Sequence, residues 1–136
     1  MVTHLIFDGN ADEAMRFYAS LFDEAAIESI DWYGAFEPGI RGSVRYATLR
    51  LGGRIVSCSD ALPGTRCEFT PAISLAVTCH DESEFERLRA ALSRDGESLG
   101  GPRRDRDGRR SAWLRDRFGV TWWLSADAPA EQALAS

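Results

Sequence analysis

The chain has 136 residues, a length typical of one domain with its own hydrophobic core. Hydrophobic residues make up 44% and charged residues 27% of it, and no apolar run approaches the roughly 20 residues of a membrane-spanning helix. The net charge is -5 and every basic residue is arginine, which argues against broad nucleic-acid binding. These properties predict a globular protein whose partners include neither nucleic acid nor a membrane.

The cysteines and the N-terminus indicate the compartment. Cys58, Cys67 and Cys79 are odd in number and lack C-x-x-C spacing, which argues against a disulfide framework and a structural zinc site. The stretch MVTHLIFDGN has no basic segment followed by a cleavable apolar segment, so nothing in it directs secretion. We therefore expect a reducing, cytoplasmic location.

The first elements along the chain are a strand and a helix. The run VTHLIF at 2–7 predicts a short strand that ends at the turn signal Asp8-Gly9. Asn10 with Glu13 three residues later is a capping-box pattern, in which two side chains satisfy backbone N–H groups at a helix start. An amphipathic helix over residues 11–22 is expected, because apolar residues recur at helical spacing at Ala14, Phe17, Tyr18 and Leu21.

Further strands complete this half of the chain. β-branched and aromatic residues over 25–36 predict a strand, which EPGIRG at 37–42 ends. The segments at 43–51 and 54–60 flank Gly52-Gly53, a two-residue loop typical of type I′ or II′ hairpin turns because glycine accepts positive φ. The first half therefore has the order strand, helix and three strands.

A linker follows, and then the pattern repeats. The segment at 62–71 holds two prolines and a glycine, and AISLAVTC at 72–79 predicts the next strand. DESEFERLRAALSRDG then repeats the first helix, with Asp81 and Glu84 as a capping-box pair and Gly96 just beyond the helix end. At an offset of 71 residues, Glu, Arg, Ala and Leu of the first helix meet the same residue types in the second.

This repeat predicts an α+β fold of two βαβββ modules. We expect a single domain over residues 1–126, with modules at about 2–61 and 72–125 joined by the linker at 62–71, and a C-terminal tail at 127–136. In a βαβββ unit the helix covers one face of the sheet, and the other face is left to curl around what the two halves enclose. Two such faces joined by a pseudo-twofold would make a cleft, and apolar clefts of that kind are where small ligands bind.

Two adjacent tryptophans near the C-terminal end, in WLRDRFGVTWWL, test this expectation. Neighbours on a β-strand point to opposite faces of the sheet. We expect Val120, Trp122 and Leu124 to pack on the helix, while Thr121 and Trp123 face the cavity.

Several stretches resemble one protein family: THLIFDGNADEAMRFYASLF, LGGRIVSCSD, FTPAISLAVTCHDESEFERLRAAL and WLRDRFGVTWW. They are similar to the PhnB-like branch of the glyoxalase/bleomycin-resistance superfamily, the vicinal oxygen chelate proteins, whose branch members are often called demethylubiquinone methyltransferase-like. The resemblance covers about residues 2–125. It implies paired βαβββ modules, usually in a homodimer, around a cup-shaped cavity.

The resemblance also implies which positions would hold metal ligands, and most of them carry residues that are not metal ligands. Metal-dependent members place His, Glu or Gln side chains on facing strands, so that a divalent metal chelates two substrate oxygens. Here the closing-strand position falls on Trp123, which has no lone pair for a metal, and the strand that opens the second half brings Ser74. His4 alone does not make a metal site, since zinc or iron sites take three or four protein ligands. We expect no metal and no cofactor.

The sequence therefore predicts a ligand-binding cavity. On the first strand, Leu5 and Phe7 are expected to pack on the helix, which turns His4 and Ile6 toward the cavity. The full set of expected cavity residues is His4, Ile6, Trp32, Tyr46, Cys58, Ser74, Thr121 and Trp123. For Cys58 a buried, inert thiol is the favoured alternative, because no His or Lys close in sequence would lower its pKa.

Three functions remain open, and the sequence identifies no catalytic residue. The first is a metal-free protein that binds a small, partly apolar molecule in the cavity of a homodimer. The second is a metal-dependent lyase, isomerase or dioxygenase, and the third is a structural or regulatory domain without a ligand. The methyltransferase activity in the branch name is not supported, because the turn FDGNADEA lacks the glycine-rich loop of a typical S-adenosylmethionine site.

Overall fold

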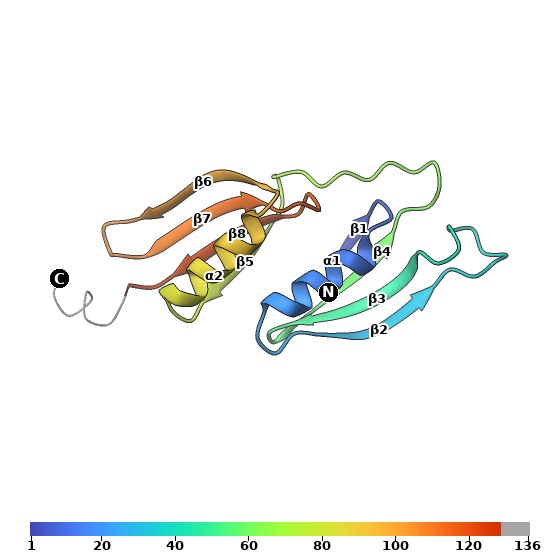
Figure 1. Cartoon of the computed structure of the whole chain (residues 1–136), viewed down its shortest axis with the longest axis horizontal. Coiled ribbons are helices and arrows are strands. Elements are labelled where there is room, and N and C mark those ends of the chain that lie inside the picture. The colour runs from blue at the N-terminus through green and yellow to red at the C-terminus, as the bar shows by residue number, and fades with distance from the viewer. Residues whose placement is uncertain (129–136) are drawn as a thin grey trace. The chain divides into compact units, whose positions relative to one another are not determined.

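The computed structural model describes residues 1–128 and divides into two compact units, which we call unit 1 (residues 1–68) and unit 2 (from Phe69 onward) (Figure 1). The boundary lies within the segment expected as a linker, 62–71. Most of the expected tail, 129–136, lies outside the described residues. No helix within residues 1–128 is long and apolar enough to cross a membrane.

Unit 1 is a βαβββ module. Its strands form one four-stranded sheet in the order β1-β4-β3-β2, in which β1 runs parallel to β4 and the other neighbours are antiparallel. The helix covers one face of this sheet (Figure 1). The elements are β1 (Thr3–Phe7), α1 (Ala11–Leu21), β2 (Ala26–Trp32), β3 (Val44–Leu51) and β4 (Arg54–Asp60).

Unit 2 repeats the same topology. Its sheet has the order β5-β8-β7-β6, again with a parallel pair, β5 and β8, that is connected through the helix. The elements are β5 (Ser74–Cys79), α2 (Glu82–Ser93), β6 (Glu97–Arg104), β7 (Arg110–Arg115) and β8 (Thr121–Ala126). The predicted α+β class and the pair of βαβββ modules are confirmed.

Alternation along β1 assigns the two faces of the sheet in unit 1, as predicted. Leu5 and Phe7 are 7% and 1% exposed, whereas His4 and Ile6 are open to solvent. Neighbouring residues in register share a face of a sheet. We call the side on which the helix packs the helix face of each sheet, and the opposite side its open face.

The start of α1 differs from the capping box that the sequence predicts. The side chain of Asn10 makes no capping hydrogen bond. The backbone N–H of Ala11 instead donates to the carboxylate of Asp60 over 2.9 Å, and the N–H of Val44 donates to the other oxygen over 2.8 Å. Because Asp60 is 4% exposed, this carboxylate replaces a local cap and ties α1, β3 and β4 together.

The start of α2 matches its prediction, while its end is shifted. The carboxylate of Asp81 accepts from the N–H of Glu84 over 2.8 Å, the hydrogen bond of a helix cap. Beyond the helix it is Asp95, with φ of 58°, and not Gly96 that takes the left-handed conformation. Gly96 serves close packing, since a Cβ there would lie 2.2 Å from the carbonyl oxygen of Arg115.

A buried carboxylate also shapes the turn between β7 and β8, which divides the run at 113–124 into a hairpin. Asp116 is 3% exposed, and one of its oxygens accepts from the backbone N–H groups of Phe118 and Val120. Its other oxygen accepts from the indole N–H of Trp122 over 2.8 Å. This set of bonds fixes the turn and anchors Trp122 in the core.

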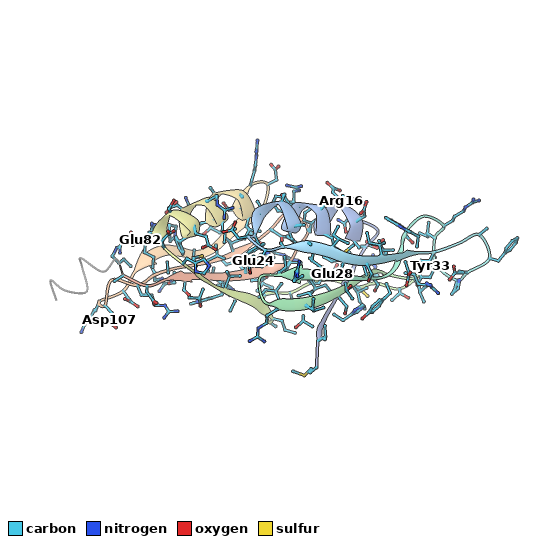
Figure 2. The ribbon with its side chains drawn as sticks, turned by 90° about the horizontal axis from the view of Figure 1, so that it is seen from below. Arg16, Glu24, Glu28, Tyr33, Glu82 and Asp107 are labelled. Carbon is cyan, nitrogen blue, oxygen red and sulfur yellow. The ribbon has the colours of Figure 1, made fainter. Side chains whose placement is uncertain are left out.

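Ion pairs lie on the outer surfaces of both units. In unit 1, Arg16 pairs with Asp12 along α1, and Glu28 of the edge strand β2 pairs with Arg50. Figure 2 labels Arg16 and Glu28. These side chains are 39–62% exposed, so each pair contributes little to stability.

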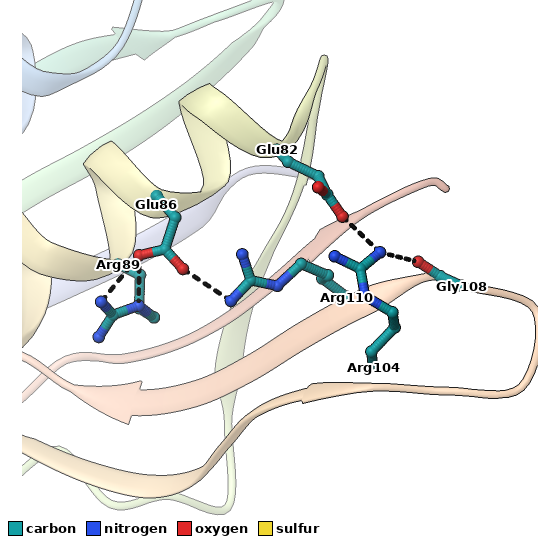
Figure 3. A network of polar contacts seen from close by, with 6 residues as sticks. All are labelled: Glu82, Glu86, Arg89, Arg104, Gly108 and Arg110. Atoms are coloured by element: carbon teal, nitrogen blue, oxygen red, sulfur yellow. Dashed lines mark hydrogen bonds and ion pairs between the residues drawn. The ribbon is translucent and has the colours of Figure 1, made fainter. Parts of the chain in front are cut away.

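In unit 2 a larger ionic network joins α2 to the β6–β7 hairpin (Figure 3). Glu86 pairs with Arg110 at 2.7 Å and with Arg89 at 2.8 Å. Arg110 also lies over the ring of Phe85, 4.8 Å from its centroid, and Arg104 pairs with Glu82. Hydrogen bonds from Arg89 are the largest cause that lowers the pKa of Glu86, and those from Arg110 add to it.

This network predicts an acid-dependent loss of stability. Since the folded pKa of Glu86 lies below its ordinary value of 4.5, its contribution is fully present above that value and is lost as the pH falls through the folded pKa. Glu86→Gln should lower the free energy of unfolding at neutral pH by less than about 1 kcal/mol, because the pair is partly exposed. Urea denaturation should show this difference vanish in acid.

The matched control is Glu97→Gln, which removes an exposed glutamate of β6. It should leave the pH dependence unchanged. Equal losses in the two variants would contradict a role for the network.

Candidate functional site

The open face of unit 1 holds an imidazole between two serines. Nδ1 of His4 lies 2.6 Å from Oγ of Ser57, and Nε2 lies 2.9 Å from Oγ of Ser59. The ring of Tyr46 stacks on the imidazole with centroids 5.8 Å apart and planes 10° apart. Both ring nitrogens and one ring face of His4 are therefore engaged, which fixes its orientation.

Hydroxyl groups continue across the sheet from this imidazole. Ser29, Thr48, Ser57 and His4 lie in register on β2, β3, β4 and β1. The hydroxyls of Ser29 and Thr48 lie 2.8 Å apart. We call these four residues the hydroxyl row, which gives the open face of unit 1 a hydrogen-bonding character.

The open face of unit 2 carries two indoles instead. Trp123 is 45% exposed, whereas its neighbour Trp122 is 1% exposed, as the alternation predicts. Trp113 of β7 lies opposite Trp123, with ring centroids 6.5 Å apart and planes tilted by 51°. The indole N–H of Trp113 donates to Oγ of Ser74 over 3.0 Å, which fixes that ring beside Trp123.

Thr121 shares the open face of unit 2, although it is buried. It pairs in register with Ser74 and Arg115 and is 1% exposed. Its Oγ1 is buried without a hydrogen-bond partner among the described residues. Thr121 therefore stands beside the indoles without an exposed surface of its own.

Two expected cavity residues are not placed on an open face. Placing Cys58 in a cavity was wrong, because it pairs in register with Leu5 and Ala47 on the helix face and is 0% exposed. Burial, with a smaller contribution from the nearby Asp60, raises the pKa of its thiol to about 12. Trp32 is 42% exposed at the end of β2, beyond a register shift, so strand alternation does not assign its face.

Sequence reasoning missed Trp113. The signal was present in the run at 113–124, where DRFG separates two alternating segments that each carry a tryptophan. If this run is taken as a hairpin, Trp113 and Trp123 come to lie opposite each other on adjacent strands. Treating it as one strand concealed the pair.

The two open faces present different chemistry at equivalent positions. The parallel pairs end at Phe7 with Asp60 in unit 1 and at Cys79 with Ala126 in unit 2. Counting back three residues from Asp60 and from Ala126 aligns Ser57 with Trp123. The same registers align Thr48 with Trp113 and His4 with Ala76.

The residues do not fit a metal centre. Within residues 1–128, no group of three or more His, Cys, Asp or Glu side chains is placed to hold a metal ion. Both nitrogens of His4 contact serine hydroxyls, and both oxygens of Asp60 accept backbone N–H groups. His4 and Asp60 are thus committed to other partners.

A hollow of about 490 Å³ lies away from these residues, at one end of the β6–β7 hairpin. Two of its charged side chains already have partners in unit 2. Arg115 donates to the carbonyls of Phe69 and Gly119, and Asp116 holds the turn. It is wide open and contains none of the expected ligand residues, so we favour the open sheet faces as binding surfaces.

The fold is that of glyoxalase/bleomycin-resistance proteins. The fosfomycin resistance protein FosX from Listeria monocytogenes, solved with Mn(II) and sulfate, is 17% identical and has a TM-score of 0.64, with 98% of this chain and 95% of that chain covered. At that identity the likeness concerns the fold alone.

Closer relatives define the family. The PhnB protein from Bacillus cereus is 39% identical over 93% of this chain and 98% of that chain, with a TM-score of 0.87. Protein PA1353 from Pseudomonas aeruginosa is 26% identical over 95% and 98%, with a TM-score of 0.84. Residues 1–125 match the family described as 3-demethylubiquinone-9 3-methyltransferase, and the chain belongs to this PhnB-like family. No curated protein matches the sequence.

Thiol reactivity tests the placement of the cysteines. Burial raises the pKa of Cys79 to about 11, with nearby Glu84 adding to the shift, so at neutral pH Cys58 and Cys79 stay protonated. Cys67 is only half-buried. Iodoacetamide should modify Cys67 at least about tenfold faster than the other two in native protein, because alkylation requires an accessible thiolate.

The control is the same reaction in denaturant, where all three cysteines should react alike. A Cys67→Ser variant should be almost unreactive when native. Rapid native labelling of Cys58, located by peptide mass spectrometry, would contradict its place on the helix face.

Proposed function

We propose that this protein binds a small, partly apolar molecule without a metal ion, on the open face of unit 2, with Trp123 as the principal contact. The observation that carries the proposal is the 45% exposure of an indole within a regular strand, beside the fully buried Trp122. An exposed indole offers a large apolar face that can stack on a flat ligand.

The surroundings of Trp123 support this function. The hydrogen bond to Ser74 holds Trp113 in place, so the second indole does not have to be ordered when a ligand binds. The rings are tilted by 51°, which leaves a corner between two apolar surfaces. Ala76 of β5 lies in register with Trp123, on the side away from Trp113, and its small side chain leaves space beside the indole.

A homodimer is part of the proposal. Exposed apolar side chains of the open faces, among them Ile6, Tyr46 and Trp123, would be covered in part by a second copy. Sedimentation equilibrium should give twice the mass of 15.1 kDa at micromolar concentration. A monomeric mass at that concentration would contradict dimerisation while leaving ligand binding to be measured separately.

The other two functions, and the compartment, have less support. A metal-dependent lyase, isomerase or dioxygenase would need ligands beyond His4 and Asp60, whose polar atoms already have partners. The methyltransferase in the family description would need a glycine-rich first turn, and here Asp60 occupies the N–H at the start of α1. Three free cysteines agree with a reducing cytoplasm, which we also propose.

Binding is tested with flat aromatic probes. Titration with indole or 2-naphthol should shift the indole N–H signals of Trp113 and Trp123 in ¹H–¹⁵N spectra. Trp123→Ala should weaken binding by roughly tenfold, because stacking and buried apolar area are both lost.

Trp32→Ala is the matched control, since Trp32 is exposed to a similar degree, 42%, but lies in unit 1. It should leave the affinity unchanged. Equal losses in both variants, or no shifts at all, would favour a domain without a ligand. Tight binding of Ni, Zn or Fe to metal-stripped protein, lost in His4→Ala, would favour the metal-dependent function.

A further inference from the structure

Ser59 has an unusual position on the open face of unit 1. It lies in register with Ile6 of β1, which is 38% exposed. On the other side lies Tyr46 of β3, which is 47% exposed. Ala47 pairs with Cys58 in the antiparallel register, so Tyr46 lies opposite Ser59. One hydroxyl is thus flanked by two exposed apolar side chains, and it lies 2.9 Å from Nε2 of His4.

The hydrogen bonds of Ser57 fix how the imidazole is protonated. Ser57 is 3% exposed, and within residues 1–128 its hydroxyl has only Nδ1 of His4 as a side-chain partner. A buried hydroxyl that leaves its hydrogen unpaired is costly, so Ser57 donates to Nδ1. Neutral imidazole has one donor nitrogen and one acceptor nitrogen. Nε2 therefore carries the hydrogen and donates to Ser59.

We propose that Ser59 is the hydrogen-bond donor of a second binding site, in unit 1, for a small neutral molecule that carries a carbonyl oxygen on an apolar frame. Because Ser59 accepts from Nε2–H, its own hydrogen is free to point away from the imidazole, toward a ligand. Donation along the chain from Ser57 through His4 to Ser59 polarises each hydroxyl in turn and strengthens the last donor. Ile6 and the ring of Tyr46 would contact the apolar frame.

The charges around this face favour a neutral ligand. Asp31, in register with Tyr46, lies 3.8 Å from Arg45, and Arg50 lies 3.2 Å from Glu28. The nearby charges of β2 and β3 are thus paired with each other. The hydroxyl row itself carries no formal charge while His4 is neutral, so neither a carboxylate nor an ammonium group would find an unpaired opposite charge there.

Nuclear magnetic resonance of the full chain tests the first step. Long-range ¹H–¹⁵N spectra in mildly alkaline buffer report which imidazole nitrogen carries the hydrogen, and His4→Gln distinguishes His4 from His80. The expected result is hydrogen on Nε2, with Nδ1 as an acceptor. Ser57→Ala should shift the population toward the Nδ1–H form, and an Nδ1–H tautomer in the unaltered protein would overturn the proposal.

The second step compares two probes of nearly equal shape, acetophenone and ethylbenzene, which differ in the carbonyl oxygen. Acetophenone should shift the signals of His4 and Tyr46 and bind roughly threefold to tenfold more tightly, the range expected for one hydrogen bond. Ser59→Ala should abolish this preference.

Ser29→Ala is the control, because it removes a hydroxyl at the far end of the hydroxyl row and should leave the preference intact. Equal binding of the two probes, the same effect in both serine variants, or no shift with millimolar acetophenone would each overturn the proposal. The readouts are His4 and Tyr46 of unit 1, so failure here is distinct from failure of aromatic probes to shift the indoles of unit 2.

Discussion

Within residues 1–128, each four-stranded sheet has one helix, and that helix packs on one of the two faces of the sheet. The parallel pairs β1–β4 and β5–β8 require a crossover connection, and the path between them includes α1 in unit 1 and α2 in unit 2. Every second residue of a strand must then be apolar and buried beneath that helix, as Leu5 and Phe7 are. The remaining residues do not pack against that helix, and binding chemistry can vary among the exposed ones with less cost to the fold.

The two repeats have used this freedom differently. At equivalent positions of the two open faces, unit 1 has His4, Ser57 and Thr48, and unit 2 has Ala76, Trp123 and Trp113. The helix faces keep the same kind of residue, for example Cys58 and Leu124, both 0% exposed. At these open-face positions the difference separates hydrogen bonding in one unit from aromatic contact in the other.

Strand alternation explains what the sequence could predict. It assigned the faces of β1 and β8 correctly because both strands have regular registers, and it identified both βαβββ modules. It failed to place Cys58. The residues Ser57-Cys58-Ser59 are all small, so no alternation of apolar and polar side chains shows which of them face the helix. The capping residue of α1 could not be predicted from local sequence. Asp60 lies 49 residues from Ala11, and only the folded sheet brings the two together.

The buried carboxylates are occupied by backbone N–H groups, which makes them poor metal ligands. Asp60 and Asp116 are the buried carboxylates among the described residues, and both accept two backbone N–H groups. A carboxylate bound in this way satisfies groups that would otherwise be orphaned in the core, so turning it toward a metal would cost roughly the penalty of leaving those N–H groups unpaired, on the order of 1–3 kcal/mol each. In this chain both buried carboxylates therefore stabilise the fold. The proposed recognition is left to imidazole, hydroxyl and indole groups, which suits a neutral, partly apolar ligand.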